Sequence, residues 1–223
     1  MNIPPNWTFK SEEIANGFDS HVREQLPWYD LVTNAVAYLG RHYIPVGGNV
    51  YDIGASTGNI GKSIQSTIGS RNARFTAVEE SQEMAKLYSG PGELVVADAC
   101  DFDFQPFDFC VVFLVLMFIP ISKRQNLVDR LIKNIKPGGC LVVVDKLDIE
   151  AGNYGSAMRR LTLQWKINNG ADPKKILEKE LSLAGYQRPI NPEILTRSAK
   201  QFFRLGEFAG WIIESSEESL ITG

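Results

Sequence analysis

The sequence contains little cysteine and little histidine, and both shortages argue against common kinds of site. Its 223 residues include 3 cysteines and 2 histidines. Cys100, Cys110 and Cys140 are far apart and form no CxxC pair, which argues against a disulfide framework and against a zinc site. We therefore expect no bound metal, with Cys100 and Cys110 as core thiols and with His21 and His42 on helix surfaces.

A long apolar segment and a strong basic excess are also missing. The longest apolar run, 109–120, ends in a proline and is shorter than the roughly 20 residues that a spanning helix needs. The N-terminal MNIPPNWTFKSEE lacks the apolar segment of a signal peptide. The formal net charge of -3 is unlike that of a general nucleic-acid binder, although a local basic patch stays open. We expect a cytoplasmic protein with no membrane partner.

The composition is that of one globular domain. Hydrophobic residues make up 44% and charged residues 22% of the chain, so it can bury a core without disulfides or metals. We expect residues 1–17 to form an N-terminal arm and residues 18–223 to form a single domain.

Short apolar segments alternate with helical patterns along most of the chain. We predict strands over 49–53, 74–78, 93–97, 109–116 and 140–145, and helices over 26–43, 59–68, 81–88 and 122–135. This alternation, with near-continuous apolar strands, is typical of an α/β fold whose mostly parallel sheet has helices on both faces. Such sheets bind ligands beyond the carboxyl ends of their strands, so the residues after each strand are candidate site residues.

The pattern changes after the strand that ends at Asp145. Residues 154–168 and 174–184 have helical patterns, and we expect a helical insert over about 150–186 that covers the carboxyl edge of the sheet. Residues 201–204 and 208–214 have the pattern of a closing pair of strands.

A glycine-rich turn follows the first predicted strand. The stretch Asp52 to Gly58 reads DIGASTG, in which bare backbone and the next helix's free N–H groups can contact a ligand. The spacing DxGxxxG matches neither the dinucleotide fingerprint nor the P-loop, because the P-loop frame would require glycine at Ser56. A tight turn without a ligand is the alternative.

Carboxylates follow the next two predicted strands. Glu79, in Val78-Glu79-Glu80-Ser81, is placed to accept hydrogen bonds from both hydroxyls of a ribose. Asp98 can accept from an adenine amino group, with Phe102 or Phe104 flanking the ring. A solvated carboxylate pair and a turn aspartate are the alternatives, but three polar groups at consecutive strand ends favour one shared site.

These motifs resemble those of class I S-adenosylmethionine (SAM) dependent methyltransferases. The resemblance is carried by DIGASTG, AVEESQEM, VADA and KPGGCLVVVD. It implies a Rossmann-like, seven-stranded sheet that ends in an antiparallel strand, here 208–214. It also implies bound SAM, with S-adenosylhomocysteine (SAH) as product, the methionine end near Gly54, Ala55 and Ser56, the ribose at Glu79 and the adenine near Asp98.

A narrower resemblance covers residues 18–148. FDSHV, LPWYDLV, VYDIGASTGNIGKSI and ISKRQNLVDRLIKNIKPGGCLVVVDK resemble the carboxy-SAM synthases of the tRNA wobble-uridine pathway and their methyltransferase relatives. In that family a tyrosine after a proline reaches the cofactor, and Tyr29 is the matching position; a helix-packing role is its alternative. The ending QFFRLGEFAGWII resembles methyltransferase-like proteins of phages and prophages, which would place the protein in a host cytoplasm. The predicted cofactor-binding residues are Tyr29, Asp52, Gly54, Ala55, Ser56, Gly58, Glu79, Glu80, Asp98, Ala99 and Phe113.

The chain departs from the synthases at two positions. Phe113 stands where they have an asparagine. The insert of the synthases also supplies an arginine that holds the added carboxylate. The insert of this chain is shorter and has no clear counterpart of that arginine. In the alternative alignment, Glu180 stands at its position. A buried carboxylate without a partner is costly, so we favour plain SAM as the cofactor. Other arginines could replace the missing one, but the sequence does not show where they lie relative to the site. These are Arg188, Arg197 and Arg204.

The sequence does not identify the methyl acceptor, but it disfavours some reactions. No NPPY or DPPY box and no Pro-Cys nucleophile follow the fourth predicted strand, which disfavours methylation of DNA bases. We expect an apolar or aromatic acceptor pocket formed by 113–119, Tyr29 and the helices after Asp145. Its predicted polar handles are Lys146, Arg159 and Arg160. A solvated helix face or a modest RNA contact is the alternative for Arg159 and Arg160 and the expectation for Lys174 and Lys175.

Three functions stay open on the sequence alone. The favoured one is a SAM-dependent methyltransferase acting on a tRNA or a small molecule, with no catalytic residue assigned. The second is a carboxy-SAM synthase, and the third is a non-catalytic SAM-binding or interaction protein. The resembling synthases are homodimers whose interface the insert supplies, so a homodimer is a further possibility here.

Overall fold

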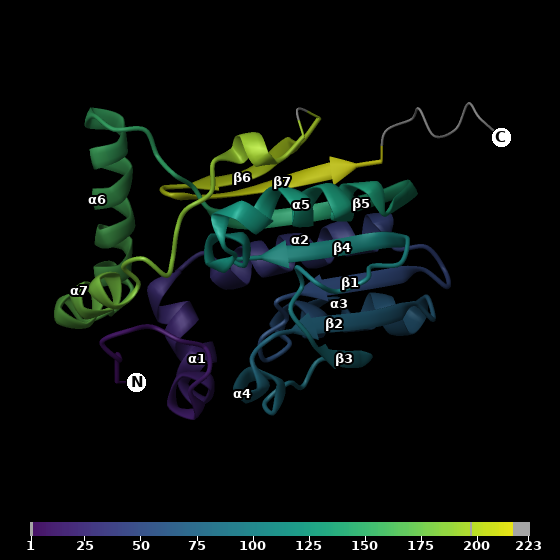
Figure 1. The fold of residues 1–223 in the computed structure, drawn as a ribbon, viewed down its shortest axis with the longest axis horizontal. Coiled ribbons are helices and arrows are strands. Elements are labelled where there is room, and N and C mark those ends of the chain that lie inside the picture. Colours follow the sequence, from purple (N-terminus) through teal and green to yellow (C-terminus); the bar gives the residue numbers. More distant parts are fainter. Residues whose placement is uncertain (1, 197, 216–223) are drawn as a thin grey trace.

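The computed structural model describes residues 2–196 and 198–215 and contains a sheet with the strand order β3-β2-β1-β4-β5-β7-β6 (Figure 1). The first five of these strands pair in parallel, and β7 pairs antiparallel with both β5 and β6. The predicted seven-stranded, mostly parallel sheet with a closing antiparallel strand is confirmed. The strands are β1 (Asn49–Ile53), β2 (Arg74–Glu79), β3 (Glu93–Val96), β4 (Phe107–Phe113), β5 (Ile135–Lys146), β6 (Lys200–Leu205) and β7 (Phe208–Glu214).

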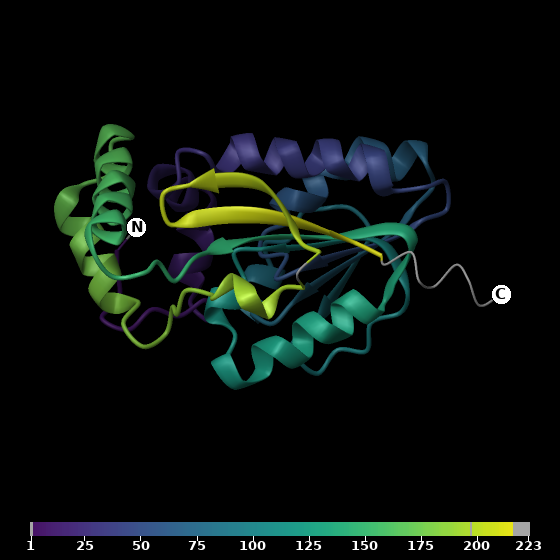
Figure 2. The same cartoon turned by 90° about the horizontal axis from the view of Figure 1, so that it is seen from above.

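Helices cover both faces of the sheet. In Figure 2, α2 and α3 lie over one face and α5 lies over the other. The helices are α1 (Glu12–Gln25), α2 (Tyr29–Tyr43), α3 (Asn59–Ser70), α4 (Gln82–Ala85), α5 (Ile121–Lys133), α6 (Asn153–Asn168) and α7 (Pro173–Ser182), with short 3-10 helices η1 (Leu116–Phe118) and η2 (Pro192–Ile194). No described helix is long and apolar enough to cross a bilayer.

Strand β4 explains why the central strands are largely apolar. Phe109 and Val111 pack into the core beneath α2 and α3, whereas Cys110 and Val112 pack into the core beneath α5. Successive side chains of a strand point to opposite faces, so a strand buried on both faces has few positions that suit polar residues.

Helices α1, α6 and α7 lie at the carboxyl edge of the parallel strands (Figure 1). The backbone amide of Trp7 donates to the Ser182 carbonyl at 3.0 Å, and the side-chain amide of Asn169 donates to the Arg23 carbonyl at 2.8 Å. The arm, α1 and the insert therefore contact one another over the edge where the predicted site residues gather.

The N-terminal prediction was wrong in detail. Helix α1 begins at Glu12, inside the predicted arm, and Ser11 caps it by accepting a hydrogen bond from the Ile14 amide. The helix predicted from residue 26 begins at Tyr29, because Pro27 separates α1 from α2; proline lacks a donor and clashes within a helix. The division into an arm and a single domain stays a prediction.

Strand β4 is shorter than predicted and β5 is longer. Strand β4 ends at Phe113, because Leu114 has a φ of 60° and turns the chain out of the sheet into η1. Strand β5 begins at Ile135, five residues before the predicted start at Cys140. Because β4 ends early, residues 114–119, which include η1, lie outside the sheet at its carboxyl edge.

Candidate active site

One cavity lies at the carboxyl edge and collects ten of the eleven predicted cofactor-binding residues. These are Tyr29, Asp52, Gly54, Ala55, Ser56, Glu79, Glu80, Asp98, Ala99 and Phe113. They come from α2 and from the ends of β1, β2, β3 and β4, which parallel pairing brings to the same edge. Gly58 does not line the cavity.

The glycine turn after β1 lies close against its neighbours. The backbone amides of Gly54 and Ala55 both donate to the Val78 carbonyl, at 2.8 and 3.1 Å. Gly54 has a φ of 66°, and a Cβ added there would lie 2.5 Å from the Val115 side chain. The backbone can therefore run beside the loop after β4 only with glycine at this position.

Gly58 has a structural position in place of the predicted binding role. It caps α3 with a φ of 94°. An added Cβ would lie 2.6 Å from the backbone nitrogen of Gly90, so the close approach here is between two backbones of the protein. Gly58 is therefore the one predicted cofactor-binding residue that the structure places outside the cavity lining.

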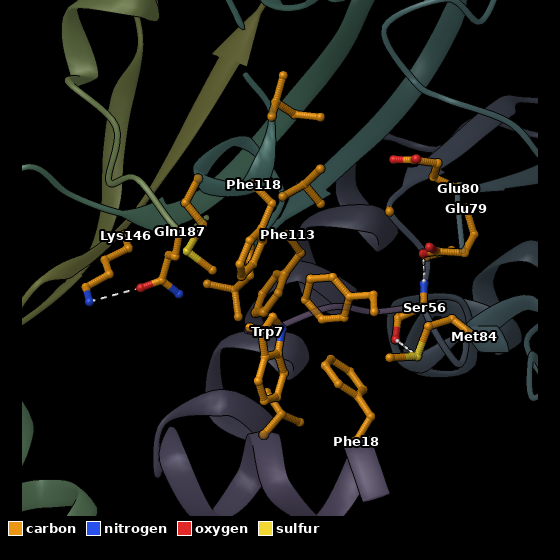
Figure 3. A pocket seen from close by; sticks show the side chains of 18 of the residues that line it. Trp7, Phe18, Ser56, Glu79, Glu80, Met84, Phe113, Phe118, Lys146 and Gln187 are labelled. Carbon is orange, nitrogen blue, oxygen red and sulfur yellow. Dashed lines mark hydrogen bonds between the residues drawn. The ribbon is translucent and has the colours of Figure 1, made fainter. Parts of the chain in front are cut away.

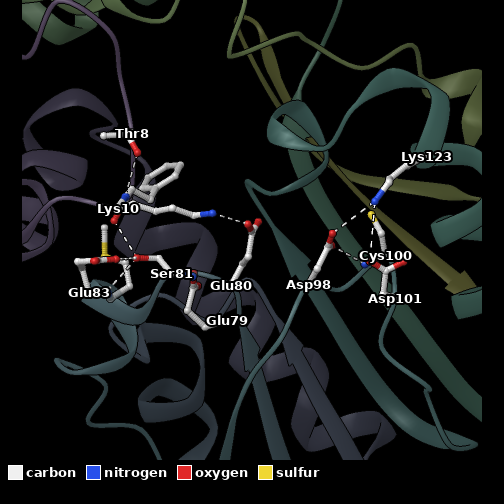
Figure 4. A network of polar contacts seen from close by, with 12 residues as sticks. Thr8, Lys10, Glu79, Glu80, Ser81, Glu83, Asp98, Cys100, Asp101 and Lys123 are labelled. Atoms are coloured by element: carbon white, nitrogen blue, oxygen red, sulfur yellow. Dashed lines mark hydrogen bonds and ion pairs between the residues drawn. The ribbon is translucent and has the colours of Figure 1, made fainter.

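Glu79 connects the glycine turn to the end of β2. Its carboxylate accepts hydrogen bonds from the backbone amides of Ser56 at 2.7 Å and Ser81 at 2.8 Å (Figures 3 and 4). Burial raises the pKa of Glu79, and the two amide donors oppose the rise. Each carboxylate oxygen keeps a second acceptor position that a ribose hydroxyl could use.

Asp98 lies across the cavity edge from Glu79, after β3. One oxygen accepts from the Cys100 amide at 2.8 Å, and the other lies 3.5 Å from Lys123 Nζ (Figure 4). Partial burial favours a higher pKa for Asp98, but the Cys100 hydrogen bonds and the Lys123 charge outweigh it and lower the pKa. Asp98 is therefore an ionised acceptor at neutral pH.

The two phenylalanines that were predicted to flank the adenine lie outside the cavity lining. Phe104 is buried and lies with its ring centroid 5.5 Å from that of Tyr51, and Phe102 packs 4.9 Å from Phe104. This aromatic cluster belongs to the core under α5, and neither phenylalanine lines the cavity.

Asp52 is a fully buried carboxylate at the base of the cavity. Its Oδ2 has no hydrogen-bond partner among the described residues, and the side chain lines the cavity. Burial, with a smaller effect of the Glu79 charge, raises the pKa of Asp52 to about 8. A cationic ligand group would supply the missing partner.

The N-terminal segment closes one side of the cavity, which the sequence analysis missed. Trp7 and Phe9 line the cavity, and Lys10 Nζ lies 2.8 Å from Glu80 Oε1 (Figure 4). The sequence signal that could have predicted this contact is the presence of two aromatic residues in an otherwise polar N-terminal arm. Exposed ion pairs contribute little free energy, so the buried Trp7 is the stronger anchor.

His21 differs from its predicted place on a helix surface. It is 6% exposed, lines the cavity and stacks on Trp7 with ring centroids 5.9 Å apart. Burial, helped by the Lys179 charge, lowers the pKa of His21 to about 3, so the ring is neutral at pH 7. Of the two predicted core thiols, Cys110 is buried and Cys100 is only half-buried; Cys140 is also buried.

The other end of the cavity is aromatic, as predicted, and it is also basic. Figure 3 shows Phe113 and Phe118 between Ser56 at one end and Lys146 at the other. Lys166 and Lys179 line the cavity together with Lys146. Lys146 was predicted as a polar handle of the acceptor pocket, whereas the sequence analysis gave no place in it to Lys166 or Lys179.

The predicted arginines lie elsewhere. Arg159, Arg160, Arg188 and Arg204 do not line this cavity. Arg159 pairs with Glu207 at 3.6 Å, and Arg204 donates to the Tyr154 hydroxyl at 3.1 Å. Arg197 lies outside the described residues.

Comparisons with known proteins agree with this geometry. A family model described as a methyltransferase domain matches residues 50–139. The carboxy-S-adenosyl-L-methionine synthase of Staphylococcus epidermidis is 30% identical over 217 residues, covering 95% of this chain and 92% of that protein. That of Shewanella woodyi is 31% identical over 187 residues, covering 80% and 77%. The plantazolicin methyltransferase BpumL, solved with SAH, shares the fold, with a TM-score of 0.61 at 11% identity over 92% of this chain and 90% of that one.

Proposed function

The chain belongs to the carboxy-S-adenosyl-L-methionine synthase family of class I SAM-dependent methyltransferases, and on this premise we propose that it binds SAM in the carboxyl-edge cavity and transfers the methyl group to an acceptor. The observation that carries the proposal is the convergence of the glycine turn, Glu79 and Asp98 on one cavity. These groups come from three strand ends and complement a backbone-contacting chain, a ribose and an adenine.

The residues present fit SAM. Glu79 keeps free acceptor positions for two ribose hydroxyls, and Asp98 is ionised and half-buried at the next strand end. Asp52 Oδ2 is buried and without a partner, as expected of a group that awaits a cation such as an ammonium. Tyr29 is buried against Phe113, with ring centroids 5.5 Å apart, and would lie beside the methionine end.

The protein's own contribution is alignment and exclusion of water. SAM, when bound, supplies an electrophilic methyl carbon for an in-line displacement. The aromatic wall of Phe113, Phe118 and Trp7 keeps water out and holds the acceptor in line, which lowers the entropic part of the barrier. No general base is assigned, and a good nucleophile needs none.

The direct test is the ligand that the purified protein retains or binds. Native mass spectrometry and titration calorimetry with SAM and SAH should show binding at one site per chain. A cavity that stays empty and takes up neither compound would favour the non-catalytic alternative and contradict the proposal.

A second candidate is carboxy-SAM synthesis. It is favoured by the near full-length match to a carboxy-SAM synthase, which extends over the α6–α7 insert, whereas the general methyltransferase model matches 50–139 alone. A retained ligand heavier than SAM by a carboxyl group would establish this function.

The remaining expectations are proposals of the same kind. A small molecule and a tRNA are the two candidate acceptors, the cytoplasm is the expected location, and a homodimer is the expected assembly if the insert keeps the family's interface. Incubation of tRNA, proteins and metabolite fractions with labelled SAM would separate the acceptor classes, and light scattering would give the assembly.

A further inference from the structure

Gln25, the last residue of α1, has a buried side-chain amide without a partner. The residue is 4% exposed, and neither its Nε2 nor its Oε1 has a hydrogen-bond partner among the described residues. The side chain lines the carboxyl-edge cavity. Most buried side-chain polar atoms are hydrogen-bonded, and each exception calls for a reason. The proposed contacts to SAM use the glycine turn and the strand-end carboxylates, so they leave this amide without a role.

The cavity face of α1 places Gln25 beside the helical insert. His21, one turn earlier, also lines the cavity, and residues four apart share a face of a helix. His21 Nε2 lies 2.5 Å from Nζ of Lys179 on α7. Asn169, directly after α6, donates to the Arg23 carbonyl at 2.8 Å. The proposed cofactor contacts come instead from the ends of β1, β2 and β3, so Gln25 lies on the side of the cavity that is left for the acceptor.

Trp7 supplies a second buried donor without a partner in the same region. Its ring is 4% exposed and stacks on that of His21, with centroids 5.9 Å apart. The ring lines the cavity, yet Nε1 has no hydrogen-bond partner in the described part of the chain. A buried indole N–H usually has an acceptor. Two unpartnered polar groups next to one histidine indicate that a polar ligand group completes this part of the cavity.

The amide of Gln25 restricts the kind of group that it can bind. Nε2 donates and Oε1 accepts, so full pairing requires a ligand group that does both. A carboxylate would pair with Nε2 and leave Oε1 without a donor, and an ammonium would do the reverse. A hydroxyl or a carboxamide can pair with both atoms. Val22 and Leu26, from the same end of α1, line the cavity too, so the rest of the ligand meets an apolar wall.

We propose that Gln25 is a specificity-determining residue for the second substrate, which it selects by an uncharged hydroxyl or carboxamide on an apolar or aromatic small molecule. Trp7 Nε1 is a second donor to the same ligand. The N-terminal segment, α1 and the insert contact one another over this edge, which favours a small molecule over a macromolecule. The inference rests on the proposed function for the position of the cofactor.

Stability tests the unpaired amide without any ligand. A buried polar group without a partner destabilises the folded protein, whereas an apolar group of similar shape does not. Gln25→Leu should therefore melt at the same temperature as the original protein or higher. Gln25→Met checks that the result does not depend on the shape of leucine, and Gln65→Leu, on the exposed side of α3, is the matched control. A lower melting temperature for both Gln25 variants would show a structural role and overturn the proposal.

Binding is tested on the full chain loaded with SAH, with benzamide and benzyl alcohol as probes. Acetophenone has the shape of benzamide without the donor, and ethylbenzene has the shape of benzyl alcohol without the hydroxyl. Titrations followed by NMR of the probes should give at least about tenfold tighter binding of one polar probe than of its shape-matched partner, because that probe pairs both amide atoms. Gln25→Leu should remove this preference and leave SAH affinity unchanged, whereas Gln65→Leu should keep it.

Each outcome decides the inference. A preference that Gln25→Leu removes supports it, and the preferred probe shows whether a hydroxyl or a carboxamide is bound. Equal affinities within both pairs of probes, or a preference that persists in Gln25→Leu, overturn it. Loss of SAH affinity in Gln25→Leu also overturns it, because Gln25 would then contact the cofactor. If the original protein does not bind SAH, the proposed function fails, and the same titrations on the unloaded protein still decide the role of Gln25.

Discussion

The Glu79 carboxylate accepts a hydrogen bond from the Ser56 backbone amide at 2.7 Å, and this bond joins the turn after β1 to the end of β2. The same carboxylate accepts from the Ser81 amide at 2.8 Å. Two backbone donors therefore hold one side chain in place at the cavity, and a ligand need not pay to order it. This preorganisation gives the first test of the site.

Glu79→Ala should weaken SAH binding at least about tenfold, because a hydrogen bond to a charged group contributes about 1.5–3 kcal/mol. Titration calorimetry measures the change. Glu93→Ala, an exposed carboxylate at the start of β3, is the control and should bind SAH normally. Equal affinity for both variants would remove Glu79 from the proposed ribose site.

Gly58→Ala should destabilise the protein, because an added Cβ would lie 2.6 Å from the Gly90 backbone and the φ of 94° strains any L side chain. Gly69→Ala, on α3 with nothing within 4 Å of the added carbon, should be neutral or stabilising by up to about 1 kcal/mol. Urea unfolding compares the two. A Gly58 variant as stable as the Gly69 variant would show that the two backbones can move apart freely.

Asp52→Asn should flatten the pH dependence of stability in the absence of SAM. Burial raises the pKa of Asp52 to about 8 in the folded state, against about 4 when unfolded, so the folded state keeps a proton that the unfolded state loses. Stability from this residue is therefore present below about pH 4 and is lost as the pH rises to about 8. The asparagine variant should gain stability relative to the original protein between these limits.

Urea unfolding at several pH values in that range measures the difference. Asp145 also titrates in a similar window, since burial raises its pKa to about 7, but it is common to both proteins and cancels. Parallel stability curves for the two proteins would contradict a raised pKa at Asp52.

Trp7→Ala should release the N-terminal segment from α1 and α7. Trp7 is 4% exposed, and its ring packs on Phe9, His21 and Lys179. Hydrogen exchange of residues 2–11 should become faster, and SAH should dissociate faster from the opened cavity.

Trp7→Phe is the control for size and polarity. The indole Nε1 has no hydrogen-bond partner among the described residues, so phenylalanine loses packing area but no hydrogen bond. It should resemble the original protein more closely than the alanine variant does. Unchanged exchange in Trp7→Ala would mean that the other contacts of the segment, such as the Lys10–Glu80 pair and the Trp7 backbone hydrogen bond, hold it without the indole ring.

Local patterns were sufficient to predict the parallel sheet and the residues at its carboxyl edge. Asp52 and Glu79 lie at the ends of β1 and β2, and Gly54 and Asp98 follow β1 and β3. Parallel pairing brings all these strand ends to one edge whatever the loops do. Side-chain alternation and turn glycines are short-range properties, so they are readable without the tertiary structure.

The sequence did not predict which side chains meet through the packing of helices that are far apart in the chain. Lys166, Lys179 and His21 meet only because α6 and α7 pack over α1, and the same lysines on a solvated helix would have an identical sequence pattern. The close packing of Gly58 was also not readable, because its neighbour, Gly90, lies 32 residues away in the chain. The sequence by itself determined the sheet and its ligand-binding edge, whereas the tertiary structure alone decided which charges close the cavity, because that depends on long-range contacts.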